Sequence, residues 1–394
     1  MYAPRLRKIY ILSFLFSLHL AISAYVNSSF LASVVGEHYV GLLYTLAAAS
    51  TLLLFSNTRV ILKYFGNKKF TFILLLINII ALLGMIYGTG PMVIGGAFIL
   101  FITTNNLVYY CLDIFIEQFG TAENIGKIRG LYLTIINVAW VMSPLITSYL
   151  IKNAGGYIAI YIMALIAVSI MLLGMATGIG DFKDKSYTKK PFLETYRFLK
   201  NNHHIRAIAI INFLLQFFFA WMVVYTPIYL HKHIGLPWDS MGIIFTAMLL
   251  PFVLFGLPVG KLIDTYHVHK RTLLTIGTII ISGATIAMSF FTQQNIWVWA
   301  FILFMTRVGA TLLETVGEIY FFTHVKEEDS YLLSIYRDMT PLGYIIAPLL
   351  GTLFLTFFPF KYLFLTLGIL MLATLYYISR LKHNHELTIS SENK

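Results

Sequence analysis

Charged residues are scarce in this sequence, since Asp, Glu, Lys and Arg make up 11% of its 394 residues and hydrophobic residues make up 58%. A soluble domain needs a charged surface, so this composition excludes a soluble globular protein. Cysteine is almost absent, because Cys111 stands alone, and a disulfide framework is therefore excluded. The sequence also lacks a nucleotide-binding loop, a metal-ligand spacing and a nucleophile–base motif. We therefore expect no cofactor or metal, and neither an enzyme nor an ATP-driven pump.

Long apolar runs occupy most of the chain. A helix that crosses the hydrocarbon core of a bilayer needs roughly 20 mainly apolar residues. The breaks between the runs contain turn-forming residues, as in 88–91 and 153–156. The sequence therefore predicts an all-α, multi-pass membrane protein with twelve transmembrane helices, at about 9–34, 39–64, 69–88, 91–118, 129–152, 156–178, 206–231, 239–264, 270–291, 295–323, 331–357 and 360–381.

Lysine and arginine are distributed unevenly between the predicted loops. Of the 28 in the sequence, 23 lie at the termini and in the loops after every second helix, and only Lys152, Lys232 and Lys361 lie in the opposite loops. By the positive-inside rule, both termini are then cytoplasmic. This bias also accounts for the net charge of +11, so we expect no nucleic-acid partner. We expect a monomer in a cell membrane, the bacterial inner membrane.

One long basic connection divides the predicted helices into six and six. Apolar residues within it recur at helical spacing, which predicts an amphipathic helix on the inner leaflet. The predicted organisation is an N-terminal six-helix bundle at 1–178, a cytoplasmic linker at 179–205, a C-terminal six-helix bundle at 206–382 and a disordered cytoplasmic tail at 383–394.

The two halves match each other in register. Asp113 and Glu117 in the fourth predicted helix correspond to Glu314 and Glu318 in the tenth, at an offset of about 201 residues. The basic segments after the second and eighth helices correspond at nearly the same offset. Two copies of a six-helix unit, with a binding site at the bilayer midplane between them, are typical of secondary transporters.

The segments after the second and eighth helices carry a resemblance to the major facilitator superfamily, whose signature there is Gly-x-x-x-Asp-(Arg/Lys)-x-Gly-(Arg/Lys)-(Arg/Lys). The second copy has Gly260, Asp264 and the basic pair Lys270–Arg271, with His267 in place of the later glycine. In the first copy Lys63 replaces the Asp.

This resemblance covers the whole chain and implies two pseudo-symmetric six-helix bundles that alternate access to a central cavity. In the superfamily, helices one, four, seven and ten line that cavity. The proline signature of drug antiporters in the fifth helix is poorly kept, since Pro144 lacks its glycines.

Charged residues within the predicted spans are functional candidates, because a charge in the bilayer is costly. The resemblance implies a cytoplasmic gate for such clusters. A second interpretation is that Glu314 or Asp113 titrates and couples transport to protons. The residues assigned to gating or proton coupling are Asp113, Glu117, Arg129, Gly260, Asp264, Lys270, Arg271, Glu314, Glu318, Arg337 and Asp338.

Arg307 lies near the middle of the tenth predicted helix, about two turns from Glu314. Its planar guanidinium suits the carboxylate or phosphate of an anionic substrate. The alternative is an internal ion pair with Glu314.

Polar and aromatic residues in the first, fourth, fifth and seventh helices suit the wall of a substrate cavity. His19 is either a packing residue or a proton carrier. The amides either join helices by hydrogen bonds or bind substrate. The cavity candidates are His19, Asn27, Asn105, Asn137, Trp140, Asn212, Gln216, Trp221, Tyr225 and Arg307.

These features together predict a transporter that moves a small molecule by alternating access, with H⁺ as the coupling ion and membrane lipid around it. Three functions remain open. The first is export of amphipathic or drug-like compounds, the second is uptake of a small polar or anionic solute, and the third is translocation of a lipid or lysolipid.

Overall fold

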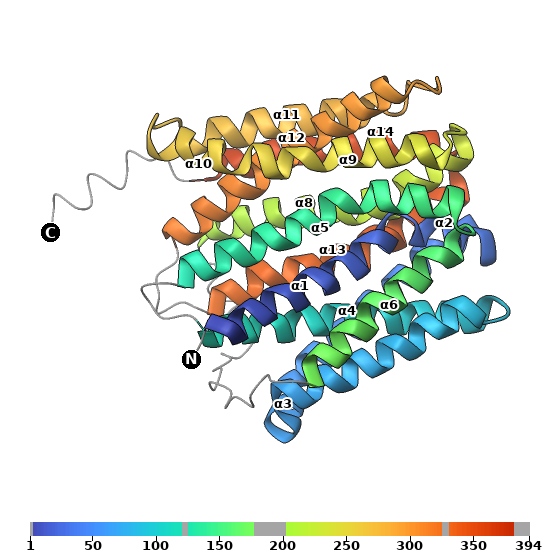
Figure 1. Ribbon diagram of the computed structural model, residues 1–394. Coiled ribbons are helices and arrows are strands. Elements are labelled where there is room, and N and C mark those ends of the chain that lie inside the picture. Colours follow the sequence, from blue (N-terminus) through green and yellow to red (C-terminus); the bar gives the residue numbers. More distant parts are fainter. Residues whose placement is uncertain (1–2, 120–124, 177–201, 325–330, 382–394) are drawn as a thin grey trace, which may run out of the picture. The chain divides into compact units, whose positions relative to one another are not determined.

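The computed structural model of this chain describes residues 3–119, 125–176, 202–324 and 331–381 (Figure 1). Within these ranges every regular element is a helix, as the composition predicts. The predicted linker helix and the tail lie largely outside the described residues. The helices are α1 (Ala3–Ala24), α2 (Asn27–Val34), α3 (Glu37–Tyr87), α4 (Pro91–Phe119), α5 (Ile125–Asn153), α6 (Tyr157–Ala176), α8 (His203–Ile228), η1 (Tyr229–His233), α9 (Trp238–Leu254), α10 (Gly256–Asp264), α11 (Lys270–Ala287), α12 (Ile296–His324), α13 (Tyr331–Phe357) and α14 (Lys361–Ser379).

Eleven stretches of the described residues are long and apolar enough to cross a membrane. They correspond to eleven of the twelve predicted spans. The twelfth is α11, a helix of 18 residues that begins with the basic pair Lys270–Arg271. The polar first turn of α11 leaves a shorter apolar stretch than a full membrane span needs. The helix nevertheless packs against α12 and α14 in the same unit.

Three of the predicted spans are irregular in the structure, and a proline explains one of them. The seventh span ends in a single π-helical turn, η1, which begins two residues after Pro227. The eighth is divided into α9 and α10 at Phe255. Pro258 lacks an N–H for the carbonyl of Leu254, and its ring clashes with that carbonyl, so the helix restarts there. The first span is also divided, at 25–26, where no proline is present.

Two left-handed residues mark corresponding positions in the two halves. The long helix α3 is broken at Gly66, which has φ 71° and ψ 158°. After α10, His267 has φ 52° and is the only residue other than glycine with positive φ in the described chain. The two positions have the offset of about 201 residues found in the sequence. A positive φ therefore recurs at this position even where the glycine is missing.

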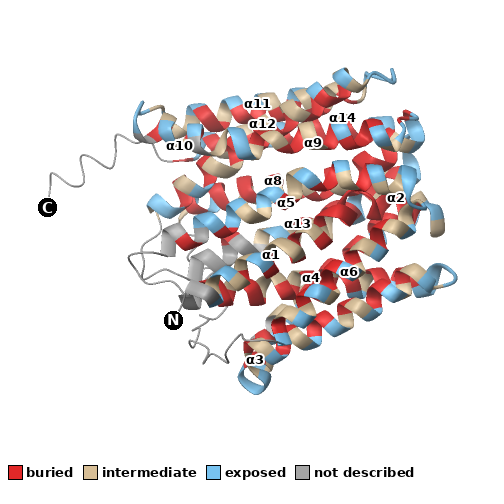
Figure 2. Ribbon diagram, in the orientation of Figure 1, coloured by how far each residue is buried: buried red, intermediate tan, exposed pale blue. Residues whose placement is uncertain are grey.

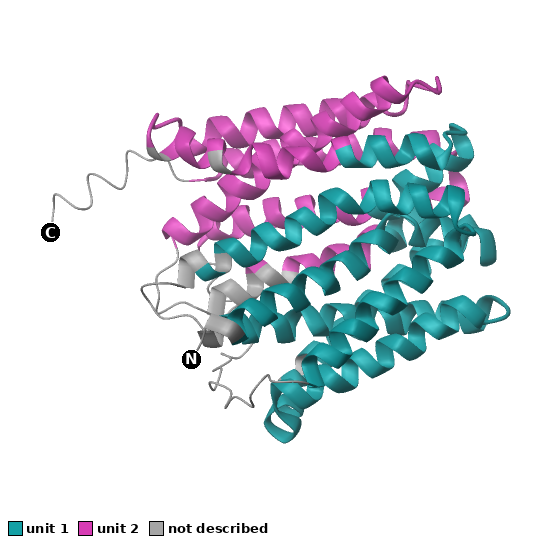
Figure 3. Ribbon diagram, viewed as in Figure 1, with its two compact units in different colours: residues 1–186, 223–246, 348–352 teal, residues 187–222, 247–347, 353–394 magenta. Residues whose placement is uncertain are grey.

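The chain forms two compact units (Figure 3). Unit 1 contains residues 1–186, 223–246 and 348–352, and unit 2 contains residues 187–222, 247–347 and 353–394. These units differ from the two predicted bundles, because two segments of the second sequence half belong to unit 1. The division into bundles at 178 and 206 stays a prediction.

Each unit is built from helices with one buried and one exposed face (Figure 2). In unit 1, α3 packs against α4 and α6, and α1 packs against α5 and α6. The exposed faces carry large apolar side chains such as Leu53, Tyr87 and Leu173. An apolar surface of this kind suits hydrocarbon rather than water.

In unit 2, α11 and α12 approach closely at two glycines. A Cβ atom on Gly309 would lie 2.6 Å from the carbonyl oxygen of Gly277 and 2.6 Å from the backbone nitrogen of Ile281. Small residues allow helices in a bilayer to reach this separation. The contact holds α12, which carries Arg307, against α11.

Candidate functional site

Arg307 is a buried cation among aromatic rings in unit 2. Its side chain is on α12, and the residue is only 2% exposed. The guanidinium carbon lies 5.0 Å from the ring centre of Phe219, 5.7 Å from that of Phe218 and 5.8 Å from that of Phe252. Two of the rings come from α8 and one from α9. These three phenylalanines could not be singled out from the sequence, because it contains 32 phenylalanines.

Among the residues that the structure describes, no anionic side chain is in contact with Arg307. The ion pairs found among the described residues do not include it, and its Nε is buried without a hydrogen-bond partner. Glu314 is near enough to interact electrostatically with Arg307 and with Glu318. Two helical turns separate Arg307 from Glu314, however, and a contact pair between them is not formed.

The predicted amides of α8 form hydrogen bonds inside unit 2. Asn212 donates from Nδ2 to the carbonyl oxygen of Tyr336 in α13, at 2.8 Å. Gln216 donates to Asn212 Oδ1 at 3.4 Å. Trp221 is buried, with its ring centre 5.2 Å from that of Phe217. These contacts fit the interpretation of the amides as links between helices.

The predicted residues His19 and Asn105 meet in unit 1. His19 Nε2 lies 3.0 Å from Asn105 Oδ1, and His19 Nδ1 lies 3.2 Å from the carbonyl oxygen of Ala164. Asn78, which the sequence did not single out, donates to Asn105 Oδ1 at 2.9 Å and to Thr104 Oγ1 at 2.8 Å. This fully buried network joins α1, α3, α4 and α6.

The other predicted cavity residues of unit 1 are dispersed. Asn27 is buried and accepts a hydrogen bond from the Tyr161 hydroxyl at 2.9 Å. Trp140 is half-buried, with its ring 6.3 Å from that of Tyr25. Asn137 is exposed on α5. Only His19 and Asn105 of the predicted set therefore contact each other in this unit.

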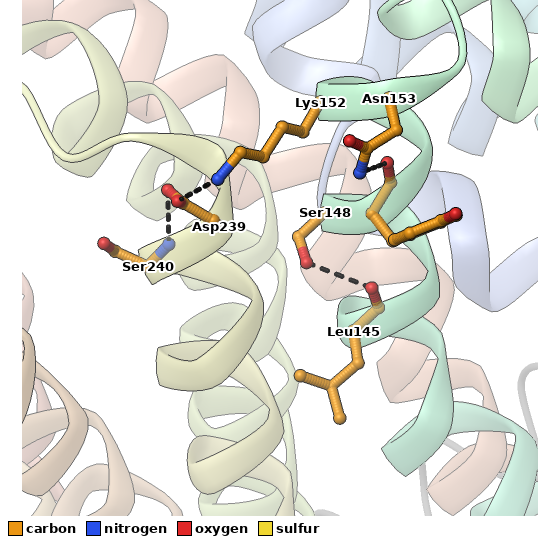
Figure 4. Close-up of polar contacts among 7 residues, drawn as sticks. Leu145, Ser148, Lys152, Asn153, Asp239 and Ser240 are labelled. Carbon is orange, nitrogen blue, oxygen red and sulfur yellow. Dashed lines mark hydrogen bonds and ion pairs between the residues drawn. The ribbon is translucent and has the colours of Figure 1, made fainter.

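The end of α5 and the start of α9 are joined by an ion pair that the sequence did not predict (Figure 4). Lys152 Nζ lies 3.0 Å from Asp239 Oδ2. Lys152 is in the last turn of α5 and Asp239 is in the first turn of α9, where each charge is favoured by the helix dipole. One turn further in, a Cβ atom on Gly242 would lie 2.3 Å from Ser148 Oγ. We call these residues the α5–α9 contact.

A second ion-pair group joins the start of α3 to η1, also within unit 1. Glu37 Oε1 lies 3.2 Å from Lys232 Nζ, and Glu37 Oε2 lies 3.0 Å from His233 Nε2. Lys232 also reaches the carbonyl oxygen of Ala32 at 3.4 Å. Lys152 and Lys232 are two of the three basic residues in the loops predicted to face outward. Basic residues are rare in these predicted loops, and this rarity could have identified Lys152 and Lys232 as candidates for ion pairs.

Tyr225 connects three helices of unit 1. Its hydroxyl donates to the carbonyl oxygen of Pro348 in α13, at 2.6 Å. A Cβ atom on Gly41 of α3 would lie 2.4 Å from that hydroxyl, and one on Gly351 would lie 2.3 Å from the ring. We call this arrangement the Tyr225 contact. It gives Tyr225 a packing role that is more specific than a place in a cavity wall.

Of the eleven residues assigned to gating or proton coupling, five have side chains outside the described part of the chain. This holds for Glu117, Arg129, Asp264, Arg337 and Asp338, although their backbone is helical. Among the remaining members, Asp113 is half-buried in α4, Glu318 is exposed, and Gly260 has open space around its Cα. Lys270 donates to Thr323 Oγ1 at 3.1 Å, and Arg271 Nε is buried without a hydrogen-bond partner.

A groove of about 720 Å³ lies on α11 and α12 in unit 2. Its lining is mostly apolar, with Ile280, Ala284 and Phe301 among its residues, and it contains none of the predicted site residues. The groove is therefore separate from Arg307 and from the predicted cavity.

The fold and sequence agree with one family. The sequence profile of the Major Facilitator Superfamily matches residues 9–316 and, in a second overlapping match, residues 208–393. The chain therefore belongs to the Major Facilitator Superfamily and is a transmembrane transporter with that superfamily's all-helical fold. The resemblance and the fold class predicted from the sequence are thereby confirmed.

Solved structures support the fold. A variant of the nucleoside transporter NupG is 13% identical over 96% of this chain and 100% of its own, with a TM-score of 0.79. Unmodified NupG is 12% identical over 95% and 98%, with a TM-score of 0.79. A bacterial metal transporter is 14% identical over 95% and 98%, with a TM-score of 0.67. At this identity the likeness concerns the fold alone. No curated protein matches the sequence.

Proposed function

We propose that this protein moves a small amphipathic solute across the membrane by alternating access, coupled to protons. The observation that carries the proposal is the set of contacts between the two sequence halves inside unit 1. Lys152 of the first half pairs with Asp239 of the second, and Glu37 of the first pairs with Lys232 of the second. The Tyr225 contact adds a third connection of this kind.

These contacts suit a closure that opens and closes during transport. The Lys152 and Asp239 side chains are 62% and 49% exposed, so water can solvate them when they part. Exposed pairs contribute roughly 0.2–1 kcal/mol each, which allows frequent separation. Gly242 also packs closely against Ser148, and a larger residue at 242 would not fit between α9 and α5. By the positive-inside rule this closure faces outward, and it would seal the outer side of the transporter.

Glu314 is our candidate for proton coupling. It is half-buried in α12 and makes no ion pair in the described part of the chain. Protonation would remove a negative charge that interacts with Arg307 and Glu318. A carboxyl group without a fixed partner can exchange its proton with less loss of structure than one held in an ion pair.

The aromatic surroundings of Arg307 favour an amphipathic solute over a highly polar one, and we propose export as the direction. A gradient that is acid outside drives export by exchange for protons. Everted membrane vesicles energised to be acid inside should therefore accumulate the solute. Accumulation only in right-side-out vesicles would instead support the uptake alternative.

The test of alternating access needs no knowledge of the solute. Cys111 is fully buried and is the single cysteine, so Cys111→Ala gives a cysteine-free background. Thr246→Cys then places a reporter one turn inward of Gly242, where the Thr246 hydroxyl lies 3.5 Å from the carbonyl oxygen of Val141. Gly242→Leu should keep α5 and α9 apart and speed labelling by a membrane-impermeant maleimide added outside.

The matched control is Gly96→Leu, because Gly96 is also helical but has open space around its Cα. It should leave the labelling rate unchanged. Equal labelling rates in the parent and in Gly242→Leu, with both proteins folded, would contradict the proposal.

Lipid or lysolipid translocation is a second candidate, favoured by the apolar groove on α11 and α12. This function predicts that proteoliposomes transfer a fluorescent lysolipid between leaflets. Bulky substitution of Ala284, which lines the groove, should slow the transfer. Transfer no faster than in protein-free liposomes would remove this candidate.

A further inference from the structure

Arg307 is a buried charge for which the described residues provide no ion-pair partner. Transfer of a charged side chain from water to a protein interior costs several kcal/mol even after relaxation. The usual compensation is an ion pair with hydrogen bonds to the remaining protons. In the described part of the chain, Arg307 has neither a contacting carboxylate nor a hydrogen bond at Nε.

The three phenylalanine rings compensate only part of this cost. A cation–π contact is weaker than a hydrogen-bonded ion pair in a protein interior. The guanidinium carbon lies over the ring faces of Phe218, Phe219 and Phe252. These rings hold no oxygen, so the N–H groups along the guanidinium edge gain no hydrogen bond from them.

We propose that Arg307 binds the carboxylate or phosphate of an amphipathic organic anion, with the apolar body of the solute against Phe218, Phe219 and Phe252. Two oxygens of such a group match the Nε–H and Nη–H of the guanidinium edge in a bidentate pair. The bound anion would supply the contacting negative charge that Arg307 does not find among the described residues. This inference rests on the proposed transport function and adds the chemical class of the solute.

Glu314 is the internal competitor for Arg307. It interacts with Arg307 electrostatically without contact. The distance between the two residues along α12 does not by itself prevent an ion pair. Two turns correspond to only about 10 Å, and both side chains are long. In the described part of the chain the Nε–H of the guanidinium edge has no acceptor, and a bound anion would supply one.

The first part of the test measures the empty protein. The full chain is purified in detergent and its thermal unfolding is compared with that of Arg307→Met. An uncompensated cation predicts that Arg307→Met unfolds at the same or a higher temperature. Arg380→Met is the control, because Arg380 is exposed and lies over the Tyr376 ring. Unfolding of Arg307→Met at a clearly lower temperature than Arg380→Met would show a structural role and overturn the proposal.

The second part uses defined probes, namely benzoate, naphthoate and phenyl phosphate, against the uncharged benzamide, naphthamide and phenol. The anions should raise the unfolding temperature of the wild type, and the uncharged compounds should not. Loss of a charged hydrogen-bond pair predicts binding weaker by about tenfold or more in Arg307→Gln. Arg307→Lys keeps the charge but lacks the bidentate edge, so it should also bind the anions more weakly.

Two results would overturn the proposal in this part. One is an equal shift in the wild type and in Arg307→Gln, and the other is a wild type that none of the anions stabilises. The labelling of Thr246→Cys involves neither Arg307 nor an anion. Loss of the anion effect with the expected labelling would therefore reject the solute class and leave alternating access in place.

Discussion

His267 has a left-handed backbone, φ 52°, at the position where the superfamily has glycine. For residues with a Cβ this conformation costs roughly 1–2 kcal/mol. The corresponding residue of the first half is Gly66, which adopts φ 71° without that cost. The turn after α10 is therefore retained at the expense of local strain.

Replacing His267 with glycine should stabilise the protein by roughly 0.5–1 kcal/mol, because the strain exceeds the extra entropy of glycine in the unfolded chain. Thermal unfolding in detergent measures this change. Tyr266→Gly is the control, since Tyr266 is exposed next to the turn and its φ is negative. It should give no gain. A destabilised His267→Gly protein would mean that the imidazole has contacts that outweigh the strain.

Glu314→Gln should remove the effect of pH on the conformation if Glu314 is the coupling residue. The groups that interact with it are Arg307, Glu318 and the Tyr336 hydroxyl. In the Thr246→Cys background the labelling rate should change on acidification, and Glu314→Gln should have the acid-state rate at every pH. Glu318→Gln, at an exposed position, should keep the pH dependence. Unaltered pH dependence in Glu314→Gln would move the coupling to another group.

For single residues, the candidate charged groups could be predicted from the sequence, but the side chains around them could not. Arg307 and Glu314 are visible because a charge within an apolar run is rare. Phe218 and Phe252 could not be distinguished from the other aromatic residues, since ring contacts depend on how α8 and α9 pack. Asn78 was missed for a similar reason, because its partners lie on a different helix.

The position of α12 depends on its close contact with α11 at Gly309 and Gly277. Gly309→Ala should destabilise the protein by about 1–3 kcal/mol, because its Cβ would meet backbone atoms that cannot rotate away. Gly283→Ala on α11 is the matched control, since nothing lies within 4 Å of its Cβ. Its better helix propensity predicts a gain of up to about 1 kcal/mol. Similar unfolding temperatures for the two variants would disprove the close crossing.

The ion pair between α5 and α9 should affect opening rather than folding. Lys152→Asp and Asp239→Lys should each speed outside labelling of Thr246→Cys, by up to about fivefold for a pair worth about 1 kcal/mol. The double variant restores opposite charges and should return the rate toward that of the parent. Additive effects in the double variant would show that the two charges do not interact.

Helices were the most predictable elements, because runs of apolar residues in a bilayer leave few alternatives to helix. Their interruptions were less visible. The break at Phe255 follows from Pro258, which the sequence contains, whereas the break at 25–26 has no local proline or glycine to mark it. The break at Gly66 was expected from the basic turn around it.

On the scale of the whole molecule, the repeat and the family could be predicted from the sequence, but the contacts between the two sequence halves within unit 1 could not. Lys152 and Asp239 are 87 residues apart, and Glu37 and Lys232 are farther apart still. Such pairs depend on how distant helices pack together, and a local sequence pattern does not show this. The inner gate predicted around Asp264 and Arg337 stays a prediction.

The central claim is that the α5–α9 contact opens and closes, and a distance between spin labels tests it most directly. Labels at the exposed positions Asn153 and Pro237, in the Cys111→Ala background, report the separation of these helix ends. Pulsed electron resonance in lipid nanodiscs should give a short and a long distance, and Gly242→Leu should reduce the short population. A single short distance in both proteins and at every pH would contradict the account.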